Sequence, residues 1–406
     1  MRSIISSLLL FLSLSSFAQN PVILISIDGF AYDYLDKFKP KNIMSLAENG
    51  VYANRMMPVF PSKTFPNHLS IVTGVYPVEH GIVHNQFFNR EINEQYTLGA
   101  GKDNSDWLTA KPIWTIAEQK GLRSAIYFWP ESQTTVEGVL PSHYFPYKHN
   151  TPNIQRIDQV VKWLKLPNDQ RPHLIVSYFS TVDSAGHTFG INSKELKIAI
   201  NDIDKNIGHL IARIAKETSL TPNIILVSDH GMTPIKRSSS INVSSLQPLS
   251  QLTRVINGQT QLYIYEDNIN KLNDVRSQLL KNELDDSLEI FVKGDYPVHW
   301  HFNEDSNVVP DMIINALPPT TFVDKRAYKG KATHGYDAIN NLNLAAIFIA
   351  NGPNIKKNLK IDSFENIHVF SLLEKLLALP ISTQVNSKLS VLENIMISKN
   401  KSDNKL

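Results

Sequence analysis

The 406-residue sequence contains no cysteine. It therefore cannot form a disulfide, bind a metal through sulfur, use a cysteine nucleophile or carry a lipid-anchored N-terminal cysteine. An excess of either charge is also lacking, because 40 Lys and Arg residues nearly balance 38 Asp and Glu residues. A net charge of +2 argues against a protein that follows a nucleic-acid duplex or a membrane surface. We find no internal repeat.

Long apolar runs are lacking beyond the first eighteen residues. Residues 1–18 contain Arg2, an apolar stretch from Ile4 to Leu14, and a small-residue end at Ser16 and Ala18. This pattern predicts a signal peptide that is cleaved after Ala18. No other segment approaches the ~18 uninterrupted apolar residues of a membrane span. We therefore expect an exported protein without a span in the mature chain. Export without disulfides favours the periplasm, with secretion as the alternative.

The mature chain alternates apolar strands with helical patterns, which predicts an α/β fold with a parallel sheet covered on both faces. The predicted strands are Val22–Ile27, Ser124–Phe128, Leu174–Phe179, Ile224–Val227 and Leu344–Ala350. The predicted helices are Pro40–Glu48, Asn67–Thr73, Lys111–Gln119, Ile154–Leu164, Ser193–Glu217 and Phe364–Leu376.

The pattern changes near Ser240, where short strands and polar turns replace the alternation. Leu262–Tyr265 and Glu289–Val292 are predicted strands, and Ile269–Leu280 is a predicted helix. We interpret residues 241–332 as an inserted α+β subdomain. Residues 19–240 and 333–397 then form the catalytic α/β domain, and residues 398–406 form a flexible tail.

Acidic residues and histidines follow three of the predicted strands. Asp28 follows the first, Asp183 and His187 follow Leu174–Phe179, and Asp229 and His230 follow Ile224–Val227. Each aspartate by itself could be a helix cap. Ligands bind beyond the carboxyl ends of parallel strands, however, and three converging carboxylates would repel one another unless a cation lay between them. Aspartate and histidine ligands without sulfur fit zinc better than manganese or iron.

The other histidines carry weaker signals. His334, after the inserted region, is by itself an ordinary loop histidine, but it could complete a second metal site. His299 and His301 flank Trp300 at strand spacing, and we predict that they share one face of a strand in the insertion. We assign structural or supporting positions to His68, His80 and His84.

The segment from Phe60 to His68 predicts a loop that opens a helix, with Pro66 near its start. The first turn of a helix offers unpaired N–H groups that attract anions such as phosphate. Thr64 in this segment could be an N-cap residue or part of an anion site.

Three motifs together resemble the ectonucleotide pyrophosphatase/phosphodiesterase family of the alkaline phosphatase superfamily. The first runs from Lys63 to Asn85 and contains Thr64-Phe65-Pro66-Asn67-His68 and Thr73-Gly74. The second is Asp183-Ser184-Ala185-Gly186-His187, and the third is Ser228-Asp229-His230-Gly231-Met232. The resemblance covers about residues 21–352 and implies an alkaline-phosphatase-like, mostly parallel sheet with helices on both faces.

The resemblance also implies two zinc ions per subunit. One would be held by Asp28, Thr64, Asp229 and His230, and the other by Asp183, His187 and His334. Thr64 would be the nucleophile, and a water would then hydrolyse the nucleotidyl-threonine intermediate. Asn85 would donate a hydrogen bond to a phosphate oxygen, and backbone N–H groups near Thr64 and Phe65 would complete the anion site.

An aromatic stretch from Phe128 to Tyr147 could hold the remainder of a diester, or it could simply pack on itself. In the nucleotide-cleaving branch that the sequence resembles, residues matching Phe65 and Tyr147 sandwich the base, Trp129 and Pro130 shape the pocket, and Leu98 lines it. A lysine of that branch is replaced by Asp103, so the neighbouring Lys102 has no assigned role.

We therefore expect a phosphodiesterase that cleaves small nucleotide diesters and pyrophosphates and releases nucleoside 5′-monophosphates. A choline-type or lipid phosphodiesterase on the same scaffold is the main alternative. A phosphomonoesterase would need a cationic partner for its additional phosphate charge, and none is identifiable. A metal-dependent binding protein without catalysis is disfavoured by the presence of Thr64.

Overall fold

The first strand, β1 (Val22–Ile27), lies inside an eight-stranded sheet and is buried along its whole length. The structure is a computed structural model, and it describes residues 20–281, 287–302, 305–325 and 328–397. The predicted signal peptide and the predicted tail, residues 398–406, lie outside the described residues. Because β1 has a neighbour on each side and helices above and below, its continuous apolar run suits it to the centre of the core.

The large sheet is mostly parallel, as the sequence predicted. Parallel pairing joins β7 to β6, β6 to β8, β8 to β1 and β1 to β9. The strands, in spatial order, are β19 (Leu359–Ile361), β2 (Val51–Ala53), β18 (Phe348–Asn351), β9 (Asn223–Val227), β1, β8 (Leu174–Phe179), β6 (Ser124–Tyr127) and β7 (His143–Phe145).

Strand β18 is the exception, because it runs antiparallel to both β9 and β2. The sequence predicted this strand over Leu344–Ala350, but it begins at Phe348, after a 3₁₀ turn that ends at Leu344. The last predicted helix was also too long at its start. Phe364–Glu365 forms strand β20 beside β3 (Met56–Met57), so helix α10 begins only at Val369.

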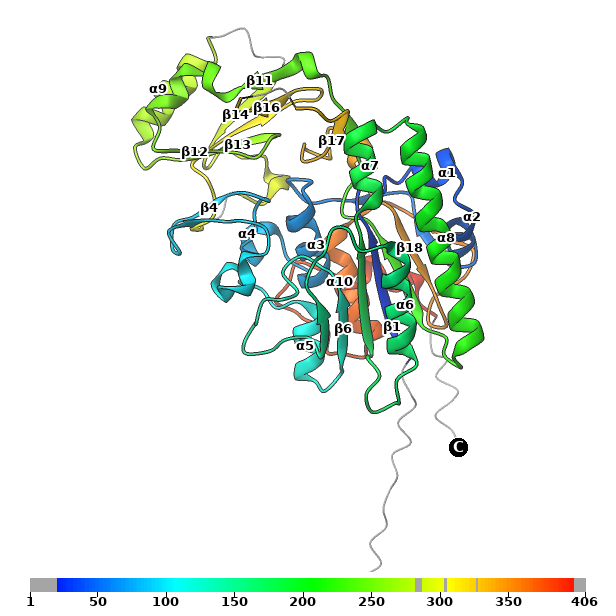
Figure 1. The fold of residues 1–406 in the computed structure, drawn as a ribbon. Coiled ribbons are helices and arrows are strands. Elements are labelled where there is room, and N and C mark those ends of the chain that lie inside the picture. The colour runs from blue at the N-terminus through cyan, green and yellow to red at the C-terminus, as the bar shows by residue number, and fades with distance from the viewer. Residues whose placement is uncertain (1–19, 282–286, 303–304, 326–327, 398–406) are drawn as a thin grey trace, which may run out of the picture.

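Helices flank the large sheet in two groups (Figure 1). Helices α2, α6 and α7 pack on the long helix α8, and α3 and α5 pack on α10. The helix bounds are α1 (Tyr34–Phe38), α2 (Lys41–Glu48), α3 (Thr64–Thr73), α4 (Pro77–His80), α5 (Ile113–Gln119), α6 (Asn153–Leu164), α7 (Thr181–Phe189), α8 (Lys194–Glu217), α9 (Ile269–Leu279) and α10 (Val369–Leu376).

A second sheet lies at the upper left of Figure 1 and has its own apolar cluster with α9. It is antiparallel, in the order β12 (Arg254–Asn257), β13 (Gln261–Tyr265), β15 (Met312–Ala316) and β14 (Leu288–Val292). At its junction with the large domain, β10 (Thr233–Pro234) pairs with β17 (Ala332–Thr333). We propose that residues 241–332 are an insertion on this basis.

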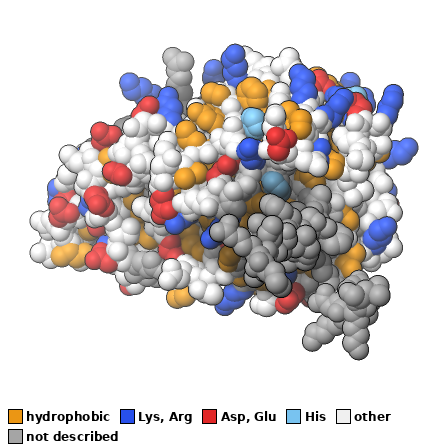
Figure 2. All heavy atoms as spheres, turned by 90° about the horizontal axis from the view of Figure 1, so that it is seen from below, with side chains coloured by type: hydrophobic (Ala, Val, Ile, Leu, Met, Phe, Trp, Pro, Cys, Tyr) orange, Lys and Arg blue, Asp and Glu red, His pale blue; other side chains and the backbone are white. Residues whose placement is uncertain are grey.

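Three further short pairs complete the described strands. They are β4 (Phe88–Asn89) with β5 (Glu94–Gln95), β11 (Ser240–Asn242) with β16 (Thr321–Val323), and β3 with β20. Side chains of both charges are spread over the face shown in Figure 2. Within the described ranges, no helix combines the length and the apolar character required to cross a bilayer.

Candidate active site

The predicted ligand residues meet at the carboxyl ends of three neighbouring parallel strands. Asp28 follows β1, Asp229 and His230 follow β9, and Asp183 lies in the first turn of α7, just after β8. These strands are adjacent in the order β9, β1, β8, so their carboxyl ends open on the same edge of the sheet.

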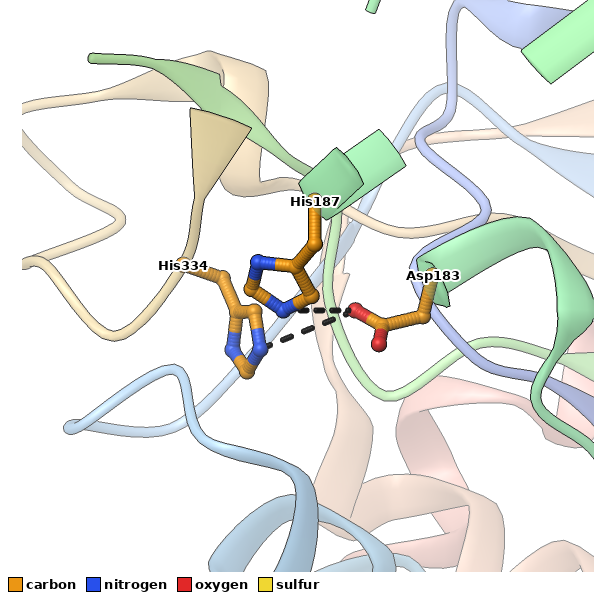
Figure 3. Close-up of side chains that lie close together, drawn as sticks. All are labelled: Asp183, His187 and His334. Carbon is orange, nitrogen blue, oxygen red and sulfur yellow. Dashed lines mark ion pairs between the residues drawn. The ribbon is translucent and has the colours of Figure 1, made fainter. Parts of the chain in front are cut away.

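Asp183, His187 and His334 form one compact group (Figure 3). Asp183 and His187 lie four positions apart on α7 and therefore share a helix face. The Oδ1 atom of Asp183 lies 3.2 Å from Nε2 of His187 and 3.7 Å from Nε2 of His334. The three donor atoms lie within 4.8 Å of one another, which suits a single metal cation.

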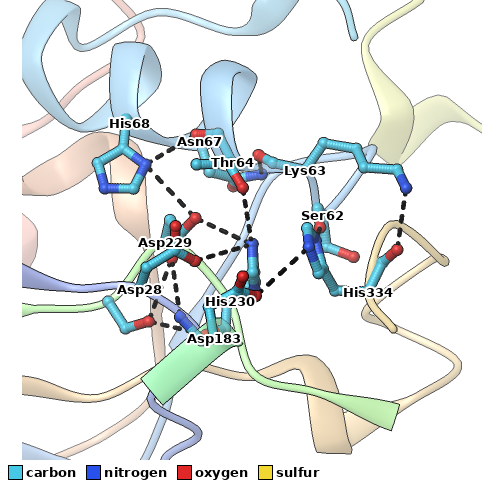
Figure 4. Close-up of polar contacts among 12 residues, drawn as sticks. Asp28, Ser62, Lys63, Thr64, Asn67, His68, Asp183, Asp229, His230 and His334 are labelled. Carbon is cyan, nitrogen blue, oxygen red and sulfur yellow. Dashed lines mark hydrogen bonds and ion pairs between the residues drawn. The ribbon is translucent and has the colours of Figure 1, made fainter. Parts of the chain in front are cut away.

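The second group centres on the imidazole of His230 (Figure 4). Its Nε2 atom lies 2.9 Å from Oδ2 of Asp229, 3.5 Å from Oδ1 of Asp28 and 3.4 Å from Oγ1 of Thr64. The structure thus brings together all four residues that the sequence grouped around this position. Donor atoms of Asp28, Asp183 and His230 also lie within 4.8 Å of one another, so Asp183 lies between the two groups.

The three imidazoles are oriented in the same way. In each, the Nδ1 atom faces a backbone carbonyl and Nε2 faces the carboxylates. The Nδ1 contacts are His187 to Ala332 O at 3.0 Å, His230 to Gly231 O at 2.9 Å and His334 to Ser62 O at 2.8 Å. Because a carbonyl can only accept, the proton lies on Nδ1 and the Nε2 lone pair is directed into the site. Metal-binding histidines are commonly held in this way.

Three buried carboxylate oxygens at the site have no hydrogen-bond donor among the described residues. They are Oδ1 of Asp28, Oδ1 of Asp183 and Oδ2 of Asp229. Buried polar atoms normally have a hydrogen-bond partner. Three carboxylate oxygens without a donor, close to three Nε2 lone pairs, are therefore suited to bind metal ions. The oxygen and nitrogen donors fit zinc, which binds both types.

Burial and mutual repulsion explain the electrostatics of the site. Burial, with the nearby charges of Asp229 and Asp183, raises the pKa of Asp28 well above its ordinary value. Burial also favours a raised pKa for Asp229, but His230 and His68 outweigh it and hold that pKa below its ordinary value. A cation between these groups would relieve the repulsion that Asp28 experiences.

The histidines respond to the same forces. Burial, together with the neighbouring imidazoles, lowers the pKa of His334 well below its ordinary value. For His187 burial acts in the same direction, but the adjacent Asp183 outweighs it and raises the pKa.

Thr64 is the first residue of helix α3, and it is not an N-cap residue. The cap position belongs to Lys63, whose side chain makes no capping bond. The Thr64 hydroxyl instead faces His230, which favours the anion-site interpretation over the capping one.

The loop before Thr64 is tied to the segment that carries His334. Ser62 accepts from His334 Nδ1 through its carbonyl, and its hydroxyl accepts from Gly335 N at 3.0 Å. The ammonium of Lys63 donates to the carbonyl of His334 at 3.1 Å. Burial lowers the pKa of Lys63 to about 7. These contacts fix the position of the loop relative to both groups of ligands.

His68 contacts groups of the site, which agrees with the structural or supporting position that the sequence predicted for it. Its Nδ1 faces the carbonyl of Thr64 at 2.8 Å and Oδ2 of Asp229 at 3.4 Å, and its Nε2 faces the Ser26 hydroxyl at 2.8 Å. His80 is buried beside Ser70 in the same helix packing.

Asn85 lies beside the start of α3. Its Oδ1 accepts a hydrogen bond of 3.1 Å from the backbone N–H of Phe65. Because an N–H can only donate, this contact assigns the oxygen and leaves the amide N–H₂ as a donor toward the cavity. The Phe65 N–H thus donates to Asn85 in this structure, and its contact with a phosphate oxygen stays a prediction.

A cavity of about 640 Å³ opens beside Thr64. All six residues predicted to contact substrate line it: Phe65, Asn85, Leu98, Trp129, Pro130 and Tyr147. Tyr147 is 48% exposed and Trp129 is 5% exposed. Trp129 also donates through Nε1 to the carbonyl of His68 at 3.2 Å. This wall of the cavity is therefore bonded to the histidine that contacts Thr64 and Asp229. Lys102 lines the cavity and faces Asp103 at 3.7 Å.

Sequence reasoning missed several residues of the site. Tyr178 lines the cavity and donates from its hydroxyl to Oδ2 of Asp28. Its position in a buried strand gave no signal. Glu131, also in the cavity wall, was hidden in a turn after β6. Ser180 and His149 lie around Tyr147, whose hydroxyl contacts them at 3.4 and 3.1 Å.

The prediction for His299 and His301 was wrong. Val298–Trp300 is a 3₁₀ turn, and His301 has a left-handed φ of 56°, so the two histidines share no strand face. His299 contacts Asp337 at 2.7 Å, and His301 stacks on Tyr76. Pro297 at the start of the turn disfavours a strand there.

Comparisons with known proteins agree with the geometry. A family model described as type I phosphodiesterase / nucleotide pyrophosphatase matches residues 22–337. An uncharacterised pyrophosphatase/phosphodiesterase of Schizosaccharomyces pombe is 34% identical over 383 residues, which cover 89% of this chain and 78% of that protein. Human ectonucleotide pyrophosphatase/phosphodiesterase family member 1 is 33% identical over 381 residues, which cover 90% of this chain and 40% of that protein.

A solved structure is similar in fold as well. Murine ectonucleotide pyrophosphatase/phosphodiesterase 5, as an inactive threonine-to-alanine variant in complex with AMP, superposes with a TM-score of 0.84 at 26% identity. The match covers 93% of this chain and all of that one.

Proposed function

Since the chain belongs to the type I phosphodiesterase / nucleotide pyrophosphatase family, we propose that it cleaves nucleotide diesters and pyrophosphates into nucleoside 5′-monophosphates. The observation that carries this proposal is the position of Thr64. Its hydroxyl lies beside His230 at the floor of a cavity walled by Phe65, Trp129 and Tyr147.

We assign Asp28, Asp229, His230 and Thr64 to one zinc ion, and Asp183, His187 and His334 to a second. When bound, the two ions would lower the pKa of the Thr64 hydroxyl and of a water, and would neutralise charge on the phosphoryl group. The donor set supports this assignment through its unsatisfied carboxylate oxygens and its inward Nε2 atoms.

The residues of the chain then have distinct tasks. The Thr64 hydroxyl releases its proton to solvent and Oγ1 attacks phosphorus, so an Oγ1–phosphorus bond forms as the bond to the leaving group breaks. Water attacks the same phosphorus in the second step and breaks the bond to Oγ1, which takes up a proton again as the nucleoside monophosphate is released. The amide N–H₂ of Asn85 donates to a phosphoryl oxygen in both steps, and the bond from Phe65 N–H holds that amide in place.

The nucleoside would occupy the aromatic part of the cavity. We assign Phe65 and Tyr147 to the two faces of the base, with Trp129, Pro130 and Leu98 around it. Stacking on aromatic faces contributes ~1–3 kcal/mol per base and tolerates any base. AMP is bound in the solved structure of the inactive murine variant, which agrees with a nucleotide in this cavity.

We further propose that the enzyme is exported, by way of the predicted signal peptide. Relatives named as ectonucleotide enzymes and as a venom phosphodiesterase of Naja atra agree with this location.

The test is a comparison of three nitrophenyl substrates with purified, zinc-loaded enzyme: thymidine 5′-nitrophenyl phosphate, nitrophenyl phosphocholine and nitrophenyl phosphate. We expect the highest kcat/KM for the nucleotide diester, loss of activity after chelation, and recovery with zinc. A preference for phosphocholine or for the monoester would overturn the assignment of the cavity to nucleotides.

A further inference from the structure

One wall of the cavity is formed by a surface segment, residues 97–103, which contributes none of the proposed metal ligands. Its lining members are Thr97, Leu98, Gly99, Ala100, Lys102 and Asp103. Leu98 is 57% exposed, and the backbone forms a short 3₁₀ turn at Ala100–Lys102. Such a segment has little apolar burial of its own, so its position depends on contacts with neighbouring elements.

Glu131 makes such a contact. It is 4% exposed and lies in the cavity wall after β6. Its Oε2 accepts from Gly101 N at 3.1 Å and from Thr134 Oγ1 at 3.0 Å, and its Oε1 accepts from the hydroxyl of Tyr96. The carboxylate therefore joins Gly101, within the 97–103 segment, and Tyr96, directly before it, to the turn that carries Trp129 and Pro130.

The packing at this junction is tight. A Cβ atom at Gly101 would lie 2.4 Å from Oε2 of Glu131 and 2.2 Å from Oγ1 of Thr134, so the backbone approaches the carboxylate directly. Glu131 itself has a left-handed φ of 57°, a backbone conformation that residues other than glycine rarely adopt. Three hydrogen bonds stabilise the buried carboxylate in this conformation. Two of them come from Tyr96 and Gly101, which lie beside and within the segment that lines the cavity.

We infer that Glu131 is a positioning residue that fixes the 97–103 segment as the nucleoside-side wall of the cavity, and thereby sets the affinity for the nucleoside part of the substrate. This inference rests on the proposed function. Glu131 acts through Gly101 and Tyr96, and Thr64 and the ligand groups do not depend on it.

Two variants separate the effect of losing the Glu131 carboxylate from the effect of straining the backbone. Glu131→Gly removes all three acceptor contacts but suits the left-handed φ, so it introduces no backbone strain. Glu131→Gln can restore them in part. Its amide oxygen can accept from Gly101 and Thr134 while its N–H₂ donates to the Tyr96 oxygen.

The experiment uses the full-length, zinc-loaded enzyme and two substrates, thymidine 5′-nitrophenyl phosphate and bis(nitrophenyl) phosphate, which has no nucleoside. Glu131→Gly should raise KM for the nucleotide about tenfold, as expected for the loss of hydrogen bonds to a charged acceptor, with kcat nearly unchanged. The KM for bis(nitrophenyl) phosphate should stay the same. Hydrogen exchange of the 97–103 amides should become faster, and Glu131→Gln should lie between the wild type and Glu131→Gly in both measurements.

Glu374 provides a matched control. It is also a buried glutamate, and it accepts from the backbone N–H and hydroxyl of Ser382, but it does not line the cavity. Glu374→Ala should lower the melting temperature and leave both KM values unchanged. If Glu131→Gly changes neither the nucleotide KM nor the exchange of residues 97–103, the inference is wrong. If the wild type shows no preference for the nucleotide, the proposed function fails instead. The hydrogen-exchange measurement still tests whether Glu131 fixes the 97–103 segment.

Discussion

Replacing Asp28 by asparagine should make the zinc-free protein more stable, although it weakens zinc binding. Asp28 is 2% exposed, and one of its oxygens accepts a hydrogen bond from Tyr178. Burial and the charges of Asp229 and Asp183 raise its pKa well above the ordinary value. Asparagine keeps the size of the side chain and an acceptor for Tyr178, but it removes the charge.

The magnitude follows from the geometry. The ligand oxygens of Asp28 and Asp183 lie within 4.8 Å of each other. Two charges at that separation repel by about 3 kcal/mol at an effective dielectric constant of about 20. Protonating Asp28 at pH 7 instead would cost about 4 kcal/mol, from an ordinary pKa of about 3.9. The folded protein incurs the smaller cost. Part of the gain is lost because the hydrogen bond from Tyr178 is stronger to a carboxylate than to an amide, by about 1 kcal/mol. We therefore expect Asp28→Asn to gain about 1–2 kcal/mol.

Urea unfolding of chelator-treated protein between pH 4 and pH 8 would measure this gain. The pKa of Asp28 is higher in the folded state than in the unfolded state. The wild-type protein is therefore not destabilised by this group below about pH 3.9, and it loses stability as the pH rises from there through the folded-state pKa. The advantage of Asp28→Asn should therefore be largest at pH 7–8 and disappear toward pH 4. A zinc titration of the same samples should show weaker binding by the variant.

The surface variant Asp158→Asn is the control. Asp158 is 42% exposed and pairs with Arg213, so its replacement should change the free energy of unfolding by less than about 0.5 kcal/mol. A zinc-free Asp28→Asn protein that is less stable than the wild type at pH 7, or a gain that does not vary with pH, would refute the repulsion that we assign to the site.

Three further changes, the last with a control variant, test other parts of the structure. Thr64→Ala should lower kcat for nitrophenyl release by more than about a thousandfold, while calorimetry shows that AMP and zinc still bind; near-normal turnover would exclude Thr64 as the nucleophile. Tyr147→Ala should raise KM for nucleotides about tenfold with little change in kcat, and an unchanged KM would argue against stacking. Gly29→Ala should weaken zinc binding, because Gly29 has φ of 69° and its added Cβ would lie 2.9 Å from Cα of Asp183. Gly121→Ala is the control, because Gly121 has a φ of 76° but open space around it. Stability measurements on this variant give the cost of the backbone conformation alone. Equal zinc affinity of Gly29→Ala and Gly121→Ala would contradict the steric argument.

The central strands could be predicted from the sequence because their β-branched runs are buried on both faces. The antiparallel direction of β18 could not, since no local pattern specifies which way a strand enters a sheet. The error at Phe364–Glu365 has a similar cause. These residues pair with β3, some three hundred positions earlier in the chain, and that long-range pairing displaced the expected helix start.

The convergence of the aspartates and of His187 and His230 was predictable because they follow strand ends, whereas Thr64 and His334 were grouped with them through the family resemblance. Asp183 and His187 also carry the i, i+4 spacing of a helix face. The supporting contacts were not predictable. Tyr178 lies within a uniformly buried strand, and only the tertiary structure places its hydroxyl against Asp28. Glu131 likewise reads as a polar turn residue until the 97–103 segment is packed on it.

The hydrogen bond from His334 to Ser62 joins positions 272 residues apart in the chain. The entropy lost in closing such a ring grows only with the logarithm of its length, and each doubling costs about 0.6 kcal/mol more. The intervening polypeptide can therefore gain or lose surface residues over evolutionary time at little thermodynamic cost. The residues at the two ends of the ring cannot vary in this way, because the contact between them orients both the Thr64 hydroxyl and the His334 imidazole.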